Sequence, residues 1–144
     1  MTCAFIIHLV TTFFMCGVCW FVQIVHYPLF KEIGETHFTK YINENYRTAW
    51  IVGPIMLLEL GSGLWFISEK FSIFFIINMV WLGIIWVSTF AIQMPLHRKL
   101  SKQYNHKHLR LLVRTNWIRT VFWSLRSVLL IYYIINANFS SDIF

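Results

Sequence analysis

Four long apolar stretches constrain this chain more than any other feature of its sequence. Each exceeds the roughly 18 residues that a helix, rising 1.5 Å per residue, needs to cross the ~30 Å hydrocarbon core of a bilayer. Membrane-crossing β-strands are about 10 residues long and alternate between apolar and polar side chains, and none of the four stretches does so. The sequence therefore predicts four transmembrane helices, at residues 4–27, 48–68, 71–94 and 113–136.

The composition agrees with an integral membrane protein of one domain. Of the 144 residues, 58% are hydrophobic and 12% are charged, whereas about 25% of residues in soluble domains are charged. The first apolar stretch has no basic start, exceeds the apolar core of a signal peptide and precedes no cleavage site, so we expect it to remain as the first span. The predicted fold is an all-α four-helix bundle of two helical hairpins, a single transmembrane domain over residues 1–144.

Charge is distributed unevenly between the loops. The loop between the third and fourth spans is basic and has no acidic residue, whereas the first long loop balances both signs. Basic residues favour the cytoplasmic side and attract anionic lipid headgroups, which explains them without a nucleic-acid partner. We expect a multi-pass protein of the inner or plasma membrane, with both long loops in the cytoplasm and both termini outside. The basic residues of that loop are Arg98, Lys99, Lys102, Lys107, Arg110 and Arg114.

The last span carries two charges on one face. Arg119 and Arg126 are seven residues apart, so they lie on one side of the helix, two turns or roughly 10 Å from each other. Trp123 falls between them, and Asn116 extends the same stripe. A charge near mid-membrane costs about 2.5–3.5 kcal/mol on insertion-based scales, so Arg126 should face the protein interior and have a partner. The best candidate is Glu59, the only acidic residue in any predicted span.

The sequence repeats itself at an offset of 67 residues. In this register Glu59 aligns with Arg126, which is a second reason to pair them. Convergence is the alternative explanation, because any helix that enters from the cytoplasm favours Arg, Thr and Trp there. A duplication would relate the two hairpins by a pseudo-twofold axis along the membrane normal. The matched segments are Pro28-Leu29 with Pro95-Leu96, and Arg47-Thr48-x-Trp50-Ile51 with Arg114-Thr115-x-Trp117-Ile118.

These polar residues predict a pocket that opens toward the cytoplasm. Two histidines, at the cytoplasmic ends of the first and third spans, could hold haem or a metal as neutral imidazoles. They could instead exchange protons, or simply lie in interfacial water. No metal-ligand spacing, phosphate loop or nucleophile–base pair appears. The predicted ligand-binding residues are Glu59, Gln93, Asn116, Arg119, Trp123 and Arg126, and the predicted cofactor-binding residues are His26 and His97.

Three functions fit this pattern. The first is a membrane-embedded binding or redox protein, an oxidoreductase among the options, that handles a small amphipathic anion such as a quinol, haem or a lipid-like molecule. The second is a small oligomeric transporter or channel. The third is a structural subunit or assembly factor of a membrane complex, in which a desolvated ion pair such as Glu59 with Arg126 only directs helix pairing.

The last span also carries a family resemblance. It contains Asn116-Trp117-Ile118-Arg119-Thr120, followed by Trp123 and Arg126, and the first and third spans end in His-x-Pro and Gln-x-Pro. This pattern resembles a bacterial family of four-span membrane proteins that is loosely similar to the anthrone-oxygenase-like membrane proteins. The resemblance implies a small helical bundle and cofactor-free or poorly defined oxidative chemistry on aromatic polyketides. Arg119 and Trp123 occupy the face on which that family carries a histidine.

Overall fold

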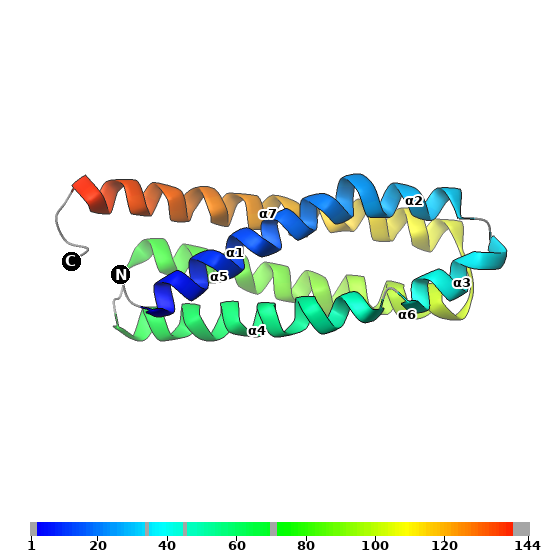
Figure 1. Ribbon diagram of the computed structural model, residues 1–144, viewed down its shortest axis with the longest axis horizontal. Coiled ribbons are helices and arrows are strands. Elements are labelled where there is room, and N and C mark those ends of the chain that lie inside the picture. Colours follow the sequence, from blue (N-terminus) through cyan, green and yellow to red (C-terminus); the bar gives the residue numbers. More distant parts are fainter. Residues whose placement is uncertain (1–2, 34, 45, 70–71, 140–144) are drawn as a thin grey trace.

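The protein is an all-α bundle of four long helical rods (Figure 1). The computed structural model describes residues 3–33, 35–44, 46–69 and 72–139, and within these ranges it has no strand. The elements are α1 (Cys3–Phe21), the π-helix η1 (Val22–His26), α2 (Tyr27–Glu32), α3 (Glu35–Glu44), α4 (Tyr46–Glu69), α5 (Ile73–Ser88), the π-helix η2 (Thr89–Gln93), α6 (Met94–Lys102) and α7 (His106–Phe139).

Four helical segments are long and apolar enough to cross a membrane. They contain the four predicted spans, except at the start of the third: Phe71 lies outside the described residues, and Ser72 precedes the helix, which begins at Ile73. Each segment also extends beyond its predicted span, at the end of the bundle where the basic helix α6 lies. At that end the helices are therefore longer than their apolar stretches indicated. The segments are Cys3–Phe30, Lys40–Glu69, Ile73–Lys102 and His106–Asn136.

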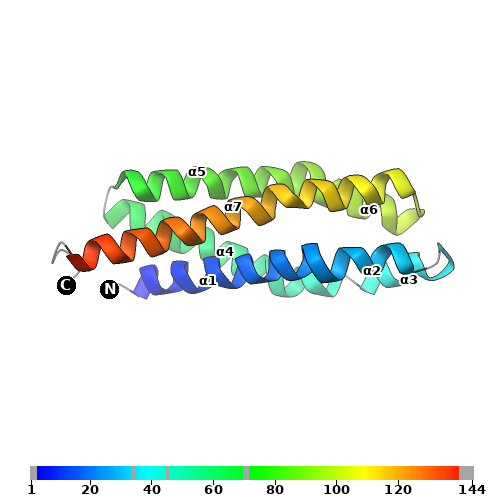
Figure 2. The same ribbon diagram turned by 90° about the horizontal axis from the view of Figure 1, so that it is seen from above.

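The rods alternate in direction, as Figures 1 and 2 show. α1 continues into α2 and α5 continues into α6 in one direction, while α4 and α7 return. Helix α1 packs on both α4 and α7, and α5 packs on α7 and less extensively on α4. The start of α1 and the end of α7 therefore lie at one end of the bundle, which we call the terminal end. The short helix α3 and the basic α6 lie at the other, the basic end.

Two π-helices interrupt the first and third rods at matching places. Their first residues, Val22 and Thr89, are 67 positions apart, the offset of the predicted repeat. Each is followed by a helix with proline in its first turn, Pro28 or Pro95. A π-helix widens the turn locally and is often found at functional sites. Both interruptions lie toward the basic end.

The core consists of three clusters along the bundle axis. Near the terminal end, four buried residues pack together: Phe5, Phe66, Phe75 and Leu130. The middle cluster contains Met15, Cys19, Met56, Ile85 and Trp123. At the basic end α3 closes the bundle with Phe38 and Ile42, which pack with Tyr27, Phe30, Leu96, Leu100, Leu109 and Leu112.

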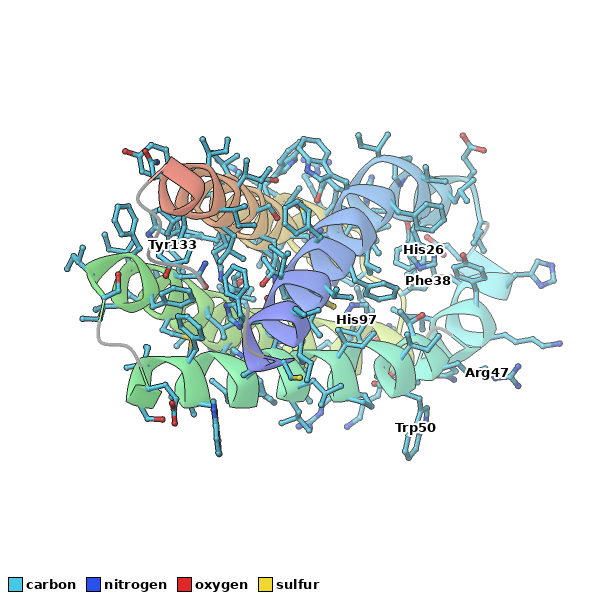
Figure 3. The ribbon with its side chains drawn as sticks, turned by 60° about the vertical axis from the view of Figure 1, so that its left-hand side comes forward. His26, Phe38, Arg47, Trp50, His97 and Tyr133 are labelled. Carbon is cyan, nitrogen blue, oxygen red and sulfur yellow. The ribbon has the colours of Figure 1, made fainter. Side chains whose placement is uncertain are left out.

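Large apolar side chains also cover the outside of the bundle. Trp50 on α4 is 83% exposed and projects away from the other helices (Figure 3). Apolar side chains on an outer surface are typical of helices that face lipid tails, where burial in the protein offers no advantage over the bilayer.

Candidate functional site

Arg126 and Glu59 form an ion pair inside the bundle. Nη1 of Arg126 lies 2.6 Å from Oε1 of Glu59, and neither side chain has exposed surface. The predicted pairing of these two residues is therefore confirmed. Because both charges are removed from solvent, each depends on the other and on nearby dipoles for stabilisation.

Hydrogen-bond donors surround the carboxylate of Glu59. The hydroxyl of Thr12 donates to Oε1 at 2.8 Å, and the indole Nε1 of Trp123 lies 3.2 Å from both carboxylate oxygens. Together with Arg126, these donors come from α1 and α7. Each of these hydrogen bonds offsets part of the cost of burying a polar group away from water.

The guanidinium of Arg126 has a second acceptor in Asn78. Its Nε and Nη2 donate to Oδ1 of Asn78 at 3.0 and 2.9 Å. Nη2 also lies 3.4 Å from Nε2 of His8, whose Nδ1 lies 3.0 Å from the backbone oxygen of Glu59. We call His8, Thr12, Glu59, Asn78, Trp123 and Arg126 the central polar cluster; it draws on α1, α4, α5 and α7.

Three members of this cluster, His8, Thr12 and Asn78, were not predicted from the sequence. His8 lies near the end of an apolar span, where a histidine is ordinarily packed or interfacial, and Thr12 and Asn78 are uncharged polar residues within apolar spans. The signal that could have identified Asn78 is its position: an amide deep in an apolar helix needs a polar partner inside the protein.

A glycine makes room for the His8 ring. A Cβ atom added to Gly63 would lie 2.9 Å from Cε1 of His8 and 2.5 Å from Sδ of Met79. Both distances are shorter than real Cβ contacts, so α4 approaches α1 and α5 this closely only because residue 63 has no side chain. Gly61, two residues earlier on α4, differs, because a Cβ atom added there would meet nothing within 4 Å.

A cavity of about 430 Å³ lies on the basic-end side of this cluster. Residues from all the helices named above contribute to its lining, and both π-helices border it. Five of the predicted site residues are brought together here: His26, Gln93, His97, Asn116 and Arg119. The apolar part of the wall includes Val52, Met56, Leu57, Trp86 and Phe90.

The structure thus divides the single predicted pocket into two sites. Glu59, Trp123 and Arg126 are fully buried in the central polar cluster and do not line the cavity. Trp123 connects the two, because Cζ of Arg119 lies 5.3 Å from the centre of its ring while its Nε1 donates to Glu59. The seven-residue spacing placed both arginines on one face correctly, but this indole fills the space between them.

Hydrogen bonds hold the polar wall of the cavity in place. Nε2 of Gln93 donates to the hydroxyl of Thr115 at 2.9 Å, and Oε1 of Gln93 accepts from Tyr27 at 3.3 Å. Asn116 donates to Oε1 of Gln23 at 2.9 Å and accepts from Nη1 of Arg119 at 3.4 Å. These contacts join η1, η2 and α7 around the cavity.

Two donors that belong to lining residues are buried without a partner. Nε of Arg119 and Nε1 of Trp86 make no hydrogen bond within the part of the chain that the structure describes. Of the described residues that line the cavity, Arg119 alone carries a permanent charge, and none is acidic. An unpartnered buried donor costs about 1–3 kcal/mol, and more when it is charged, so this wall favours a ligand with acceptor atoms.

These features define a class of protein: an all-α bundle of four helices, long and apolar enough to cross a membrane, with a buried ion pair beside a cavity that contains an arginine. Comparison of the chain with protein-family models, curated proteins and solved structures found no match.

Proposed function

We propose that this is an integral membrane protein that binds a small amphipathic anion in the cavity beside Arg119. The observation that carries the proposal is the guanidinium of Arg119, whose buried Nε has no partner among the described residues in a cavity whose lining is otherwise uncharged. A carboxylate or phosphate group would supply the missing acceptor, since guanidinium pairs with both through two parallel hydrogen bonds.

The rest of the cavity suits the apolar part of such a ligand. Its volume of about 430 Å³ lies within the roughly 300–1,000 Å³ of small-molecule sites, which are mostly apolar with a few placed polar groups. Leu57 on α4 and Phe90 on η2 line the cavity and are 61% and 54% exposed. We propose that the cavity opens between these helices, rather than only toward the cytoplasm, and that the ligand enters sideways from the bilayer.

The proposed orientation places this site near one leaflet surface. The basic loop before α7 is expected on the cytoplasmic side by the positive-inside rule, and the cavity lies toward that end of the bundle. An anionic group at Arg119 would then lie in the cytoplasmic half of the bundle, with its apolar chain directed to the proposed opening between α4 and η2.

A duplicated hairpin would explain how both walls of the cavity arose. The two π-helices lie at the repeat offset of 67 residues, and both border the cavity. Glu59 and Arg126, which the repeat aligns, contact each other across the bundle. We propose duplication as the origin of this arrangement. The shared offset of the π-helices and of the ion pair supports it.

The test compares two probes that share a chain and differ in charge. Oleate and oleyl alcohol are titrated against the detergent-purified protein, with oleyl phosphate as a second anion. Arg119→Gln should weaken binding of the anions by about 10- to 100-fold, because a charged hydrogen bond contributes roughly 1.5–3 kcal/mol. Arg119→Lys should restore part of the affinity, and oleyl alcohol should bind all variants alike.

The matched control is Arg114→Gln, which removes an exposed charge from the same helix, outside the cavity. It should leave all three affinities unchanged. Anion binding that is equal in the wild type and Arg119→Gln, or absent from the wild type, would show the proposal to be wrong.

A second candidate function is redox chemistry with bound haem. It is favoured by one observation: His26 and His97 line the same cavity as Arg119, and imidazole is a haem ligand while arginine pairs with propionate. Addition of haemin should then give a Soret band whose position changes in His97→Ala and in His26→Ala. A spectrum that is the same in both variants and the wild type rules this candidate out.

A further inference from the structure

His8 is fully buried at the junction of the four rods. The charged groups that face it are the carboxylate and backbone of Glu59 on α4 and the guanidinium of Arg126 on α7; α5 contributes the amide of Asn78 and the ring of Phe75. Both nitrogens of the imidazole have polar partners, so the partners themselves define which nitrogen carries a proton.

The Nδ1 atom of His8 is a donor. It lies 3.0 Å from the backbone oxygen of Glu59, and a carbonyl oxygen can only accept. The hydroxyl of Ser62, 3.4 Å from the same nitrogen, already has its own acceptor in that carbonyl at 3.1 Å. A neutral His8 therefore has its proton on Nδ1, which leaves a lone pair on Nε2.

The Nε2 atom of His8 faces one donor and one acceptor. Nη2 of Arg126 lies at 3.4 Å and Oδ1 of Asn78 at 3.1 Å. The amide of Asn78 is not free to exchange its oxygen and nitrogen, because two guanidinium donors of Arg126 point at the oxygen, at 2.9 and 3.0 Å. The bare Nε2 thus accepts from Arg126, and a protonated Nε2 donates to Asn78.

Glu59 differs from His8 in the partners that face it. Its carboxylate accepts from Thr12, Trp123 and Arg126. At His8, by contrast, one ring nitrogen faces both a donor and an acceptor.

We propose that the central polar cluster is a proton-binding site in which His8 changes partner from Arg126 to Asn78 as it takes up a proton. A hydronium ion gives its proton to the lone pair of Nε2, an N–H bond forms, and water is released. No bond in the protein breaks, and the summed charge of His8, Glu59 and Arg126 rises from zero to one. This site is distinct from the anion cavity and does not depend on ligand binding there.

Its position suggests how it couples to the rest of the molecule. His8 lies five residues after Cys3, or about 8 Å along the helix from the terminal end. Trp123 contacts both Glu59 and Arg119, so a change of charge in the cluster reaches the cavity wall through one side chain. The surrounding low dielectric strengthens this electrostatic connection.

The experiment is nitrogen NMR of the full chain in detergent micelles with ¹⁵N-labelled histidine. The His8 ring is identified by the signals that disappear in His8→Gln or, if that variant does not fold, by magnetisation transfer to the Phe75 ring. We expect the pattern of a neutral ring protonated on Nδ1 at high pH and that of an imidazolium at low pH. A His8 that keeps one form over the whole pH range of the folded protein overturns the proposal.

A variant of the acceptor separates this site from other histidine titrations. Asn78→Leu removes the acceptor that the protonated Nε2 requires, so the His8 transition should be lost or reduced at least tenfold in population at the wild-type midpoint. Ser88→Ala, a change at another buried polar residue of the same helical rod, should leave the transition in place. An unchanged His8 transition in folded Asn78→Leu would contradict the exchange of partners.

Discussion

Nη1 of Arg126 lies 2.6 Å from Oε1 of Glu59, and the two residues are 67 positions apart in the chain, the same offset that relates its two π-helices. The contact joins α4 of the first hairpin to α7 of the second. Because both side chains are fully buried, neither charge can be solvated if the hairpins separate within an apolar phase. Both charges are therefore stabilised only while the two hairpins are associated.

The destabilising effects of removing Glu59 and Arg126 should not be additive. Glu59→Leu or Arg126→Leu leaves an uncompensated buried charge, and we expect each to lower the free energy of unfolding by about 3–5 kcal/mol. The double variant should cost clearly less than the sum of the two. Unfolding in detergent by titrated denaturant measures this, with Glu69→Leu at the exposed end of α4 as control. Strictly additive effects would mean that the pair is not coupled.

Two glycines of α4 should respond oppositely to the same substitution. Gly63→Ala places Cβ against His8 and Met79, so overpacking should destabilise the fold by about 1–3 kcal/mol. Gly61→Ala meets open space, and it should be neutral or stabilise the helix by about 0.5–1 kcal/mol because alanine loses less backbone entropy. Thermal unfolding of both proteins in one detergent provides the comparison. Equal melting temperatures would indicate that the helices do not approach as closely as described.

The indole N–H of Trp123 should contribute to the stability of the fold. Trp123→Phe keeps an aromatic surface for Arg119 but removes the N–H that donates to both oxygens of Glu59. We expect a loss of about 1–3 kcal/mol in unfolding free energy, because a buried charged acceptor loses a donor. The control is Trp65→Phe, since Trp65 is 62% exposed; its unfolding free energy should stay within about 0.5 kcal/mol of the wild type. A similar loss in both variants argues against a specific role of the Trp123 N–H.

The orientation in the membrane can be tested with cysteine labelling. Cys3 is exposed at the terminal end, and we expect a membrane-impermeant maleimide to label it from outside intact cells. In a Cys3→Ser background, Gln103→Cys at the exposed basic end should be labelled only after the membrane is opened, since basic loops stay cytoplasmic. The reverse labelling pattern would invert the proposed topology.

Part of the site could be predicted from the sequence, because it depends on the identity of a few residues. The pairing of Glu59 with Arg126 was predictable because a charge in an apolar span needs a partner and the spans offered one acid. The presence of Gln93, Asn116 and Arg119 at one cavity followed from helix periodicity and from position at the span ends. The function assigned to these residues, and the resemblance noted for the last span, remain predictions.

The parts that could not be predicted depend on which helix faces which. Asn78 needs a polar partner inside the protein, but its local sequence does not say whether that partner comes from α4 or α7, and only packing placed its oxygen against Arg126. The π-helices themselves were not predicted, although Pro28 and Pro95, which lack a backbone N–H, follow each of them at equivalent positions.

Length, hydropathy and charge are properties of single segments, so the four long apolar helices and the meeting of a buried cation with a buried anion could be predicted from the chain alone. The completion of the polar cluster by His8 and Asn78, and its separation from the Arg119 cavity by Trp123, depend on how the helices pack. A side chain's periodicity selects its face on its own helix, but its partner is selected by the rotation and closeness of the neighbouring helices.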